Sequence, residues 1–243
     1  MDREIIVRVL EQFRNRLIFV VVMVFMLAIG CFYFIEEIRL LLTLPAEDLE
    51  MNMIYLTPPE ALMANLRLAF TAAALISLPI ILYQVVALIM AVQGKKRRSA
   101  FFLTFAMYFL FALGLSFAYF IVFPFALNFF LGFSAGDLVA EFSVARYISF
   151  ATSFLFSFGL VFQLPLVFWF LGSIGLVSTA FLRRNRKFAL LIIIIFSAVL
   201  TPPDIFSQVL MTIPLMILYE VGILMVYFTQ RRRKNEEMYH TAG

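Results

Sequence analysis

Charged residues are scarce in this chain of 243 residues: they make up 14% of it, whereas hydrophobic residues make up 64%. Soluble domains carry about 25% charged residues. Too few polar side chains are present to cover a globule in water, so the composition excludes a soluble protein and predicts a membrane protein. The excess of Lys and Arg, which sets the pI near 9.3, then reflects membrane topology and not nucleic-acid binding.

Cysteine and histidine are almost absent, with one of each in the chain. A single Cys31 cannot form an intramolecular disulfide, and its apolar surroundings favour a packed, unreactive thiol. His240 lies in the polar C-terminal tail. The motifs G-x-x-x-x-G-K-[ST], H-E-x-x-H and G-x-S-x-G and paired-cysteine metal patterns are also missing. We therefore expect no enzyme, no metal site and no cofactor.

Long apolar runs are what the chain does have. A membrane-spanning helix needs about 20 apolar residues, because hydrocarbon cannot satisfy exposed backbone groups. Six segments reach or approach this length, at about 17–35, 66–92, 100–122, 148–174, 188–200 and 205–228. The fifth spans only about 20 Å at 1.5 Å rise per residue, so we expect it to be buried or to thin the bilayer locally. The sequence predicts one all-α polytopic membrane domain over 1–243.

Lys and Arg predict the orientation, because 16 of the 19 lie in four clusters. The clusters are Arg3, Arg8, Arg14 and Arg16; Lys95, Lys96, Arg97 and Arg98; Arg183, Arg184, Arg186 and Lys187; and Arg231, Arg232, Arg233 and Lys234. They fall at the two termini, between spans two and three, and between spans four and five. Since Lys and Arg are enriched in cytoplasmic loops, both termini are predicted to be cytoplasmic.

Three further segments lie outside the expected spans. In residues 1–16 apolar residues recur at helical spacing opposite charged ones, so we expect an amphipathic helix along the cytoplasmic interface. Acids in this segment and the lack of a small-residue cleavage site exclude a cleavable signal peptide. The extracytoplasmic loop 36–65 is long enough to hold structure, with Pro45, Pro58 and Pro59 dividing it into short helices or turns. Residues 229–243 are expected to be a flexible tail.

The stretch "TPPDIFSQ" at 201–208 separates two of the most apolar runs. Thr201 is predicted to cap a helix, and Pro202 suits the first helical position because its missing N–H had no partner there. Pro203 follows, and Asp204 then lies in the first turn, where the helix dipole favours a carboxylate. The stretch therefore predicts a tight, capped hairpin tip between spans five and six.

Polar residues inside spans are costly and are functional candidates by default. Gln163 lies two residues before Pro165, which frees the carbonyl of Val161 to accept from the glutamine amide. Glu220 lies about 12 Å from the cytoplasmic end of its helix. It is expected to reach the interface, to pair with an arginine or to take up a proton.

Five blocks occur in order along the chain: "LEQFRNRL", "LPIILYQVVALI", "LGLSFAYFIVFPFALNFFLGF", "SFGLVFQLPLVFWFLGSIGLVS" and "LTPPDIFSQVLMTIPLMILYEVGI". Together they resemble the TatC family, the polytopic component of the twin-arginine protein translocase, over nearly the whole chain. The resemblance implies a glove-like bundle of six tilted spans in the cytoplasmic (inner) membrane, without catalytic activity. It also implies a homo-oligomer that assembles with TatA- and TatB-type single-span partners and uses the proton-motive force.

The resemblance also implies roles for individual residues. Twin-arginine signal peptides of folded precursor proteins would bind at the cytoplasmic surface, on a set comprising Glu11, Gln12, Arg14, Arg16, Lys96, Arg97 and Arg98. Single-span partners would bind the hairpin formed by Thr201, Pro202, Pro203, Asp204 and Gln208. Gln163 and Glu220 would be polar residues within the membrane-spanning part of the receptor.

The chain departs from the family at three positions, where Gln12, Lys96 and Gln163 stand in place of a usual glutamate. A receptor for two arginines should offer carboxylates, because carboxylate and guanidinium pair bidentately; Glu11 is the nearest acid to the first position. The loss leaves open a diverged TatC-like scaffold with altered signal recognition. A small-solute or ion transporter is a further alternative, which the lack of internal repeats disfavours.

Overall fold

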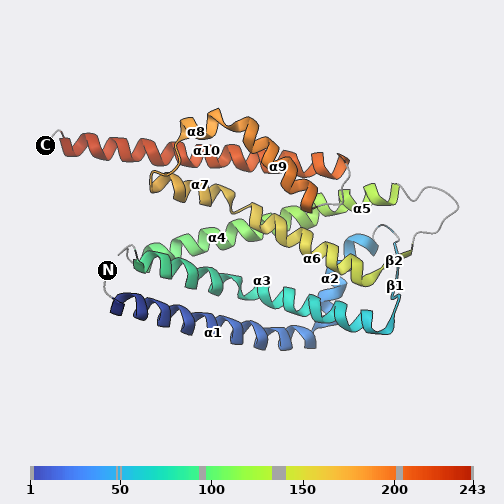
Figure 1. The fold of residues 1–243 in the computed structure, drawn as a ribbon. Coiled ribbons are helices and arrows are strands. Elements are labelled where there is room, and N and C mark those ends of the chain that lie inside the picture. Colours follow the sequence, from blue (N-terminus) through green and yellow to red (C-terminus); the bar gives the residue numbers. More distant parts are fainter. Residues whose placement is uncertain are drawn as a thin grey trace. The chain divides into compact units, whose positions relative to one another are not determined.

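The structure, a computed structural model, describes residues 3–47, 49, 51–92, 97–132, 141–200 and 205–241 (Figure 1). Its contacts divide the chain into two compact units: unit 1 comprises Met1–Phe109 and Leu127–Thr152, and unit 2 comprises Leu110–Ala126 and Ser153–Gly243. Each unit is described by itself below. The single domain expected over 1–243 stays a prediction.

Helices form nearly all of the described chain. They are α1 (Arg3–Tyr33), α2 (Ile35–Glu47), α3 (Pro58–Val92), α4 (Arg97–Phe117), a π-helical turn (Ala118–Val122), α5 (Phe123–Gly132), α6 (Val144–Val161), α7 (Leu164–Ser173), α8 (Thr179–Arg184), α9 (Arg186–Leu200) and α10 (Ile205–Thr241). Two strands of three residues each, β1 (Asn52–Ile54) and β2 (Glu141–Ser143), complete the described elements.

Five helical segments of the described chain are long and apolar enough to cross a membrane. They are Arg14–Tyr33, Pro58–Ala87, Phe101–Gly132, Val144–Ser173 and Met211–Arg231, with mean hydropathy between 1.8 and 2.4. The predicted all-α membrane class is thus confirmed. The expected fifth span falls on α9, whose 15 residues are fewer than the roughly 20 that a span needs. The count of six spans stays a prediction.

Several boundaries differ from those expected. Residues 3–16 and the expected first span as far as Tyr33 form one uninterrupted helix, α1. Residues 229–241, expected as a flexible tail, continue α10, because Gln, Arg, Lys and Glu in this stretch are good helix formers. The expected span at 148–174 is divided into α6 and α7, and the division falls just before Pro165, which cannot donate a backbone hydrogen bond.

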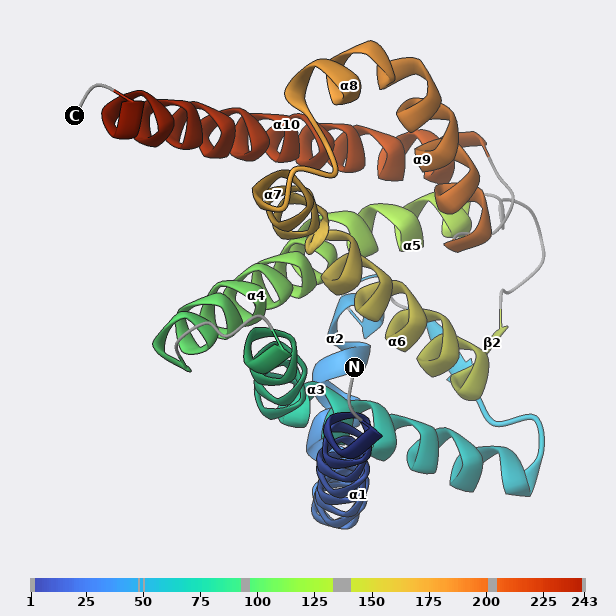
Figure 2. The same cartoon turned by 60° about the vertical axis from the view of Figure 1, so that its left-hand side comes forward.

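In unit 1, α1 packs along α3 through small residues (Figure 2). Ala28 and Cys31 of α1 form one buried cluster with Ala69 and Ala73 of α3. Small side chains let two helices approach closely in a membrane, where packing drives association. Cys31 is 7% exposed, as expected of a packed thiol.

Between α1 and α3 the chain forms a short helix and a strand. Pro45 lies inside α2 and is buried, but it does not end that helix, which continues to Glu47. Strand β1 pairs in parallel with β2, with Met53 opposite Phe142. These strands were not predicted, because three residues give too short a pattern to recognise.

Helix α3 opens on the sequence "TPPE", with Pro58 as its first residue. The Glu60 carboxylate accepts hydrogen bonds from the backbone N–H groups of Leu56 at 2.7 Å and Thr57 at 3.1 Å. It also accepts one from the Ser143 hydroxyl. One carboxylate therefore caps α3 and ties it to the end of β2. The similar start expected at 201–204 lies outside the described residues.

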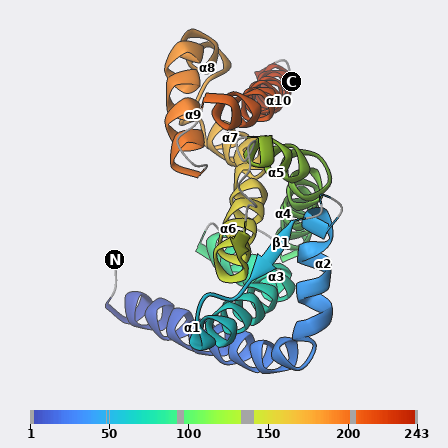
Figure 3. The same ribbon diagram turned by 90° about the vertical axis from the view of Figure 1, so that its right-hand side faces the viewer.

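In unit 2, glycines let α10 approach α7. The Cα of Gly222 faces Phe168 so closely that a Cβ there would lie 2.3 Å from Cδ2 of that ring. Gly172 faces Val226, and a Cβ added at Gly172 would lie 3.0 Å from Cγ1 of that side chain. The buried face of α10 includes Met211, Leu215, Tyr219, Ile223 and Val226. Helix α9 packs against α10, and Figure 3 shows the two helices next to each other.

Candidate functional site

The residues expected to recognise a signal peptide lie at one end of unit 1. Glu11 and Gln12 belong to α1, and Arg97 and Arg98 open α4; Lys96 lies outside the described residues. The first turns of α1, the last turns of α3 and the first turns of α4 lie at the same end of this unit (Figures 1 and 2). The fold therefore brings both parts of the expected set to one end of the unit.

Two arginines of this set differ in their surroundings. Arg16 is partly buried, and its Nη1 donates to the backbone carbonyl of Gln84 in α3 at 3.1 Å. Arg14 is exposed. Arg16 thus ties α1 to α3 and holds the start of α1 beside the end of α3, while Arg14 remains accessible. The cross-helix bond was not foreseen, because its acceptor is a backbone group that any residue type supplies.

Gln163 occupies the break between α6 and α7, and it is half-buried. Its amide nitrogen donates to the carbonyl of Gly159 at 3.4 Å, two residues before Val161, the acceptor expected from the position of Pro165. The carbonyl of Gln163 in turn accepts from Val167 N–H at 3.0 Å. The side chain therefore serves the helix in which it lies, one turn back along the chain.

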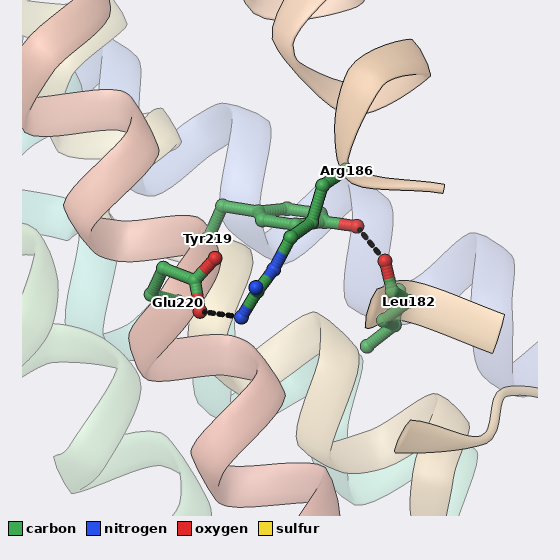
Figure 4. A network of polar contacts seen from close by, with 4 residues as sticks. All are labelled: Leu182, Arg186, Tyr219 and Glu220. Carbon is green, nitrogen blue, oxygen red and sulfur yellow. Dashed lines mark hydrogen bonds and ion pairs between the residues drawn. The ribbon is translucent and has the colours of Figure 1, made fainter. Parts of the chain in front are cut away.

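Glu220 of α10 pairs with Arg186, the first residue of α9 (Figure 4). Arg186 Nη2 donates to Glu220 Oε2 at 2.7 Å, and the two side chains are 48% and 43% exposed. The neighbouring Tyr219 hydroxyl donates to the carbonyl of Leu182 in α8 at 2.8 Å. Of the three outcomes expected for Glu220, the structure places it with an arginine, and this contact fixes the start of α9 against α10.

A second polar contact ties α8 to α10. The backbone N–H and the hydroxyl of Thr179 both donate to Gln230 Oε1, at 3.3 and 2.8 Å. Thr179 is the first residue of α8, and Ser178 caps that helix by accepting from Phe181 N–H. No motif in the sequence indicated this contact, because its two residues are 51 positions apart.

Polar side chains connect α9 and α10 within this apolar part of the sequence. Gln208 Nε2 donates to the carbonyl of Ile194 at 3.1 Å. The hydroxyl groups of Ser197 and Thr212 lie 3.5 Å apart, and Ser197 is fully buried. The hairpin thus uses the amide nitrogen of Gln208 internally. Thr201, Pro202, Pro203 and Asp204 lie outside the described residues.

The chemistry available in these sites is binding. Within the ranges that the structure covers, no three His, Cys, Asp or Glu side chains come together in a way that could hold a metal ion. The polar groups named above donate to carbonyls, accept from N–H groups or form one ion pair. Each of these contacts positions a helix.

Comparison with known proteins identifies a family. The family model for Sec-independent protein translocase protein (TatC) matches residues 8–214. A TatC of Desulforapulum autotrophicum is 35% identical over 234 residues, covering 94% of this chain and 86% of the relative. A TatC of Halalkalibacterium halodurans is 36% identical, with 95% and 92% covered. A crystal structure of the twin-arginine translocase receptor TatC has a TM-score of 0.80 at 32% identity, covering 91% of this chain and 99% of that one.

Proposed function

This chain belongs to the TatC family, and we propose that it receives twin-arginine signal peptides at the end of unit 1 where α1 begins and α4 follows α3. The family expected from five sequence blocks is confirmed. The chain is a multi-pass membrane protein and a receptor component of the twin-arginine translocase. It is a transport component and not an enzyme.

The proposed topology has six spans, with α9 as the short fifth, in a tilted, glove-like bundle and with both termini in the cytoplasm. The four clusters of Lys and Arg support this orientation, because all four fall on one side if six segments cross. The charge pattern would be inconsistent with a five-span arrangement, which would place the two termini on opposite sides.

Glu11 is the proposed carboxylate for the arginine pair. Gln12 occupies the family's usual glutamate position, so the adjacent acid is the candidate. Glu4 lies seven residues before Glu11 in the same helix, so both residues share a face. Two carboxylates on one face can each hold one guanidinium bidentately. The contact of Arg16 with α3 supports this site by fixing the helix on which Glu11 lies.

TatA- and TatB-type single-span proteins are the proposed partners of the α9–α10 hairpin, in a homo-oligomeric assembly that the proton-motive force drives. Gln208 and Thr201 would present their polar groups near the hairpin tip. Gln208 Nε2 donates one hydrogen to Ile194, so the proposed groups for a partner are the second N–H and the amide oxygen of Gln208. Interhelical bonds of this kind contribute about 0.6–2 kcal/mol.

Crosslinking of a twin-arginine signal peptide tests the proposed receptor site. A photoreactive group beside the arginine pair should label α1 of the wild-type protein. Glu11→Gln should abolish this labelling, and Lys96→Glu should increase it by replacing a repelling cation with a carboxylate. The labelling should fall as salt rises, since exposed charges are screened over about 10 Å at 0.1 M.

The alternative is a TatC-like scaffold that no longer reads the arginine pair, favoured by the absence of glutamate at Gln12 and Lys96. Wild-type labelling in Glu11→Gln together with no change in Lys96→Glu would support it. Complementation of a strain that lacks TatC, scored by export of a twin-arginine reporter, separates the two. Export requires recognition, whereas a scaffold alone would leave the reporter in the cytoplasm.

A further inference from the structure

The connection between α7 and α9 combines exposed apolar side chains with exposed cations. Leu176 is 72% exposed and Phe181 is 58% exposed. Arg183, Arg184 and Lys187 are exposed as well. Such a surface is unfavourable in water alone and in hydrocarbon alone, but it matches the headgroup layer of a bilayer, where both kinds of side chain are satisfied.

Leu176 belongs to an ordered turn. Gly175, two residues after the end of α7, has a φ of 81°. Leu176 N–H donates to the carbonyl of Leu171 at 3.0 Å, and Gly175 N–H donates to that of Gly172 at 3.1 Å. These two bonds form a Schellman motif, in which a left-handed residue closes the helix end. The fold therefore presents Leu176 at a fixed position.

The ends of two candidate spans meet at α8. One candidate span ends at Ser173, the last residue of α7. In α10 the apolar sequence ends at Phe228 and is followed by Thr229, Gln230 and Arg231. Gln230, next to that second end, accepts from Thr179 at the start of α8. Since both apolar helices reach their polar ends here, the boundary of the hydrocarbon is expected at α8. Phe181 and Leu176 can enter the acyl region there while the cations reach toward phosphate, as long basic side chains do at interfaces.

The cations of this connection are not equivalent. Arg186 is held by Glu220. For Arg183, Arg184 and Lys187, no hydrogen bond or ion pair to any described residue is present. Guanidinium groups bind phosphate bidentately, and an ammonium group binds it as a point charge. Three cations that pair with no acid among the described residues are thus available to lipid phosphates.

We propose that the surface formed by Leu176, Phe181, Arg183, Arg184 and Lys187, the α8 surface, binds anionic phospholipid headgroups. The basic side chains recognise the net negative charge, and the two apolar side chains anchor α8 among the acyl chains. Zwitterionic phospholipids offer the same phosphate with a compensating cation, so they should be bound less well. This site shares no residue with the proposed signal-peptide site, and the proposal does not depend on that site.

The chain contains its own reporter for this site. Its one Trp, Trp169, is half-buried in α7, about one turn before the end of that helix at Ser173. Bromine in the upper acyl chain quenches tryptophan fluorescence at short range. The full-length protein is reconstituted in vesicles of equal parts phosphatidylcholine and phosphatidylglycerol, with either the first or the second lipid brominated. Bulk composition is then identical, and only the lipid beside Trp169 decides the quenching.

For the wild-type protein we expect phosphatidylglycerol to be enriched about threefold beside Trp169, since each Lys or Arg near a surface attracts anionic lipid measurably. The enrichment should decrease when NaCl is raised, because screening weakens these contacts. Equal quenching by the two brominated lipids would overturn the proposal without any variant. Because this comparison uses the wild-type protein alone, it does not depend on whether a variant folds.

The triple variant Arg183→Gln, Arg184→Gln and Lys187→Gln should lose the enrichment. The matched control Arg3→Gln, Arg8→Gln and Lys95→Gln removes the same charge elsewhere and should retain it. Equal loss in both triple variants would show a general effect of net charge and contradict a local site. Unchanged quenching of all proteins by brominated phosphatidylcholine in neutral vesicles checks that Trp169 keeps its position.

Discussion

Two short helices, α2 in unit 1 and α8 in unit 2, are each held by a buried tyrosine hydroxyl. Tyr147 of α6 donates to the carbonyl of Leu42 in α2, and Tyr219 of α10 donates to that of Leu182 in α8, both at 2.8 Å. The two bonds have the same chemistry, the same length and the same kind of acceptor. What surrounds them differs.

Helix α2 has 13 residues and is supported mainly by apolar packing, since Ile35 and Ile38 pack against the buried cluster of α1 and α3. Helix α8 has six residues, of which Thr179 and Leu182 are buried. Its support is polar, from Gln230 on one side and Tyr219 on the other. A helix too short to bury much apolar surface is thus positioned by directional bonds, which specify place more than they add stability.

The largest effect should come from the close approach of α10 and α7, which leaves no space for a Cβ. Gly222→Ala would place a methyl group 2.3 Å from the Phe168 ring. That ring packs edge-on against Tyr219, with 5.5 Å between the two ring centroids. We expect a loss of about 1–3 kcal/mol in the free energy of unfolding, as for overpacked cores. Unfolding in mixed micelles with increasing denaturing detergent measures it.

Gly30→Ala in α1 is the matched control, because no atom lies within 4 Å of the added methyl group. It should be neutral or stabilising by up to about 1 kcal/mol, as alanine is the better helix former. If Gly222→Ala were as stable as Gly30→Ala, then Phe168 would move at no cost, and the packing of α10 on α7 would not depend on glycine.

How much of this was predictable depends on the range of the interaction. The membrane class and the apolar runs follow from local sequence, because length and hydropathy act within a few turns. The division before Pro165 also has a local cause, the missing N–H of proline, although one span was expected over 148–174. The pair of Arg186 and Glu220 joins residues 34 positions apart. The sequence shows both charges, but it offers four clusters of cations as partners for Glu220. The packing of α9 on α10 determines that Arg186 is the partner.

The short strands show the same limit. β1 and β2 bring together residues that are far apart in the chain, and the hydrogen bond from Ser143 to Glu60 spans 83 positions. Nothing within three residues of either strand specifies its partner, because register is set by the pattern of both segments. For the proposed signal-peptide site the sequence supplied the residues, and the fold places the starts of α1 and α4 at the same end of unit 1 (Figures 1 and 2).

The two tyrosines allow a sharper test of polar against apolar support. Tyr219→Phe and Tyr147→Phe should each lower the free energy of unfolding by about 1 kcal/mol, the net value of one hydrogen bond. Local hydrogen exchange should separate them. Amides of α8 should exchange about fivefold faster in Tyr219→Phe, whereas those of α2 should change about twofold or less in Tyr147→Phe, since apolar packing still holds α2.

Mass-spectrometric hydrogen exchange on peptides covering α2 and α8 provides this measurement. Equal acceleration in the two helices would mean that the apolar cluster contributes nothing to the position of α2. Faster exchange in α2 than in α8 would reverse the comparison and would identify Gln230 as the dominant support of α8.

The smallest effects concern the exposed pairs. Arg186 and Glu220 are about half exposed, so we expect a coupling of about 0.5–1 kcal/mol from a double-mutant cycle of Arg186→Gln and Glu220→Gln. In unit 1, Arg39 Nη1 donates to the exposed Tyr55 hydroxyl at 3.0 Å. Arg39→Gln and Tyr55→Phe should couple by less than about 0.5 kcal/mol, because water replaces this neutral acceptor. A coupling at Arg39 equal to that at Arg186 would show that the ion pair gains nothing from its charge or from the low dielectric of its surroundings, and that α9 is positioned by packing alone.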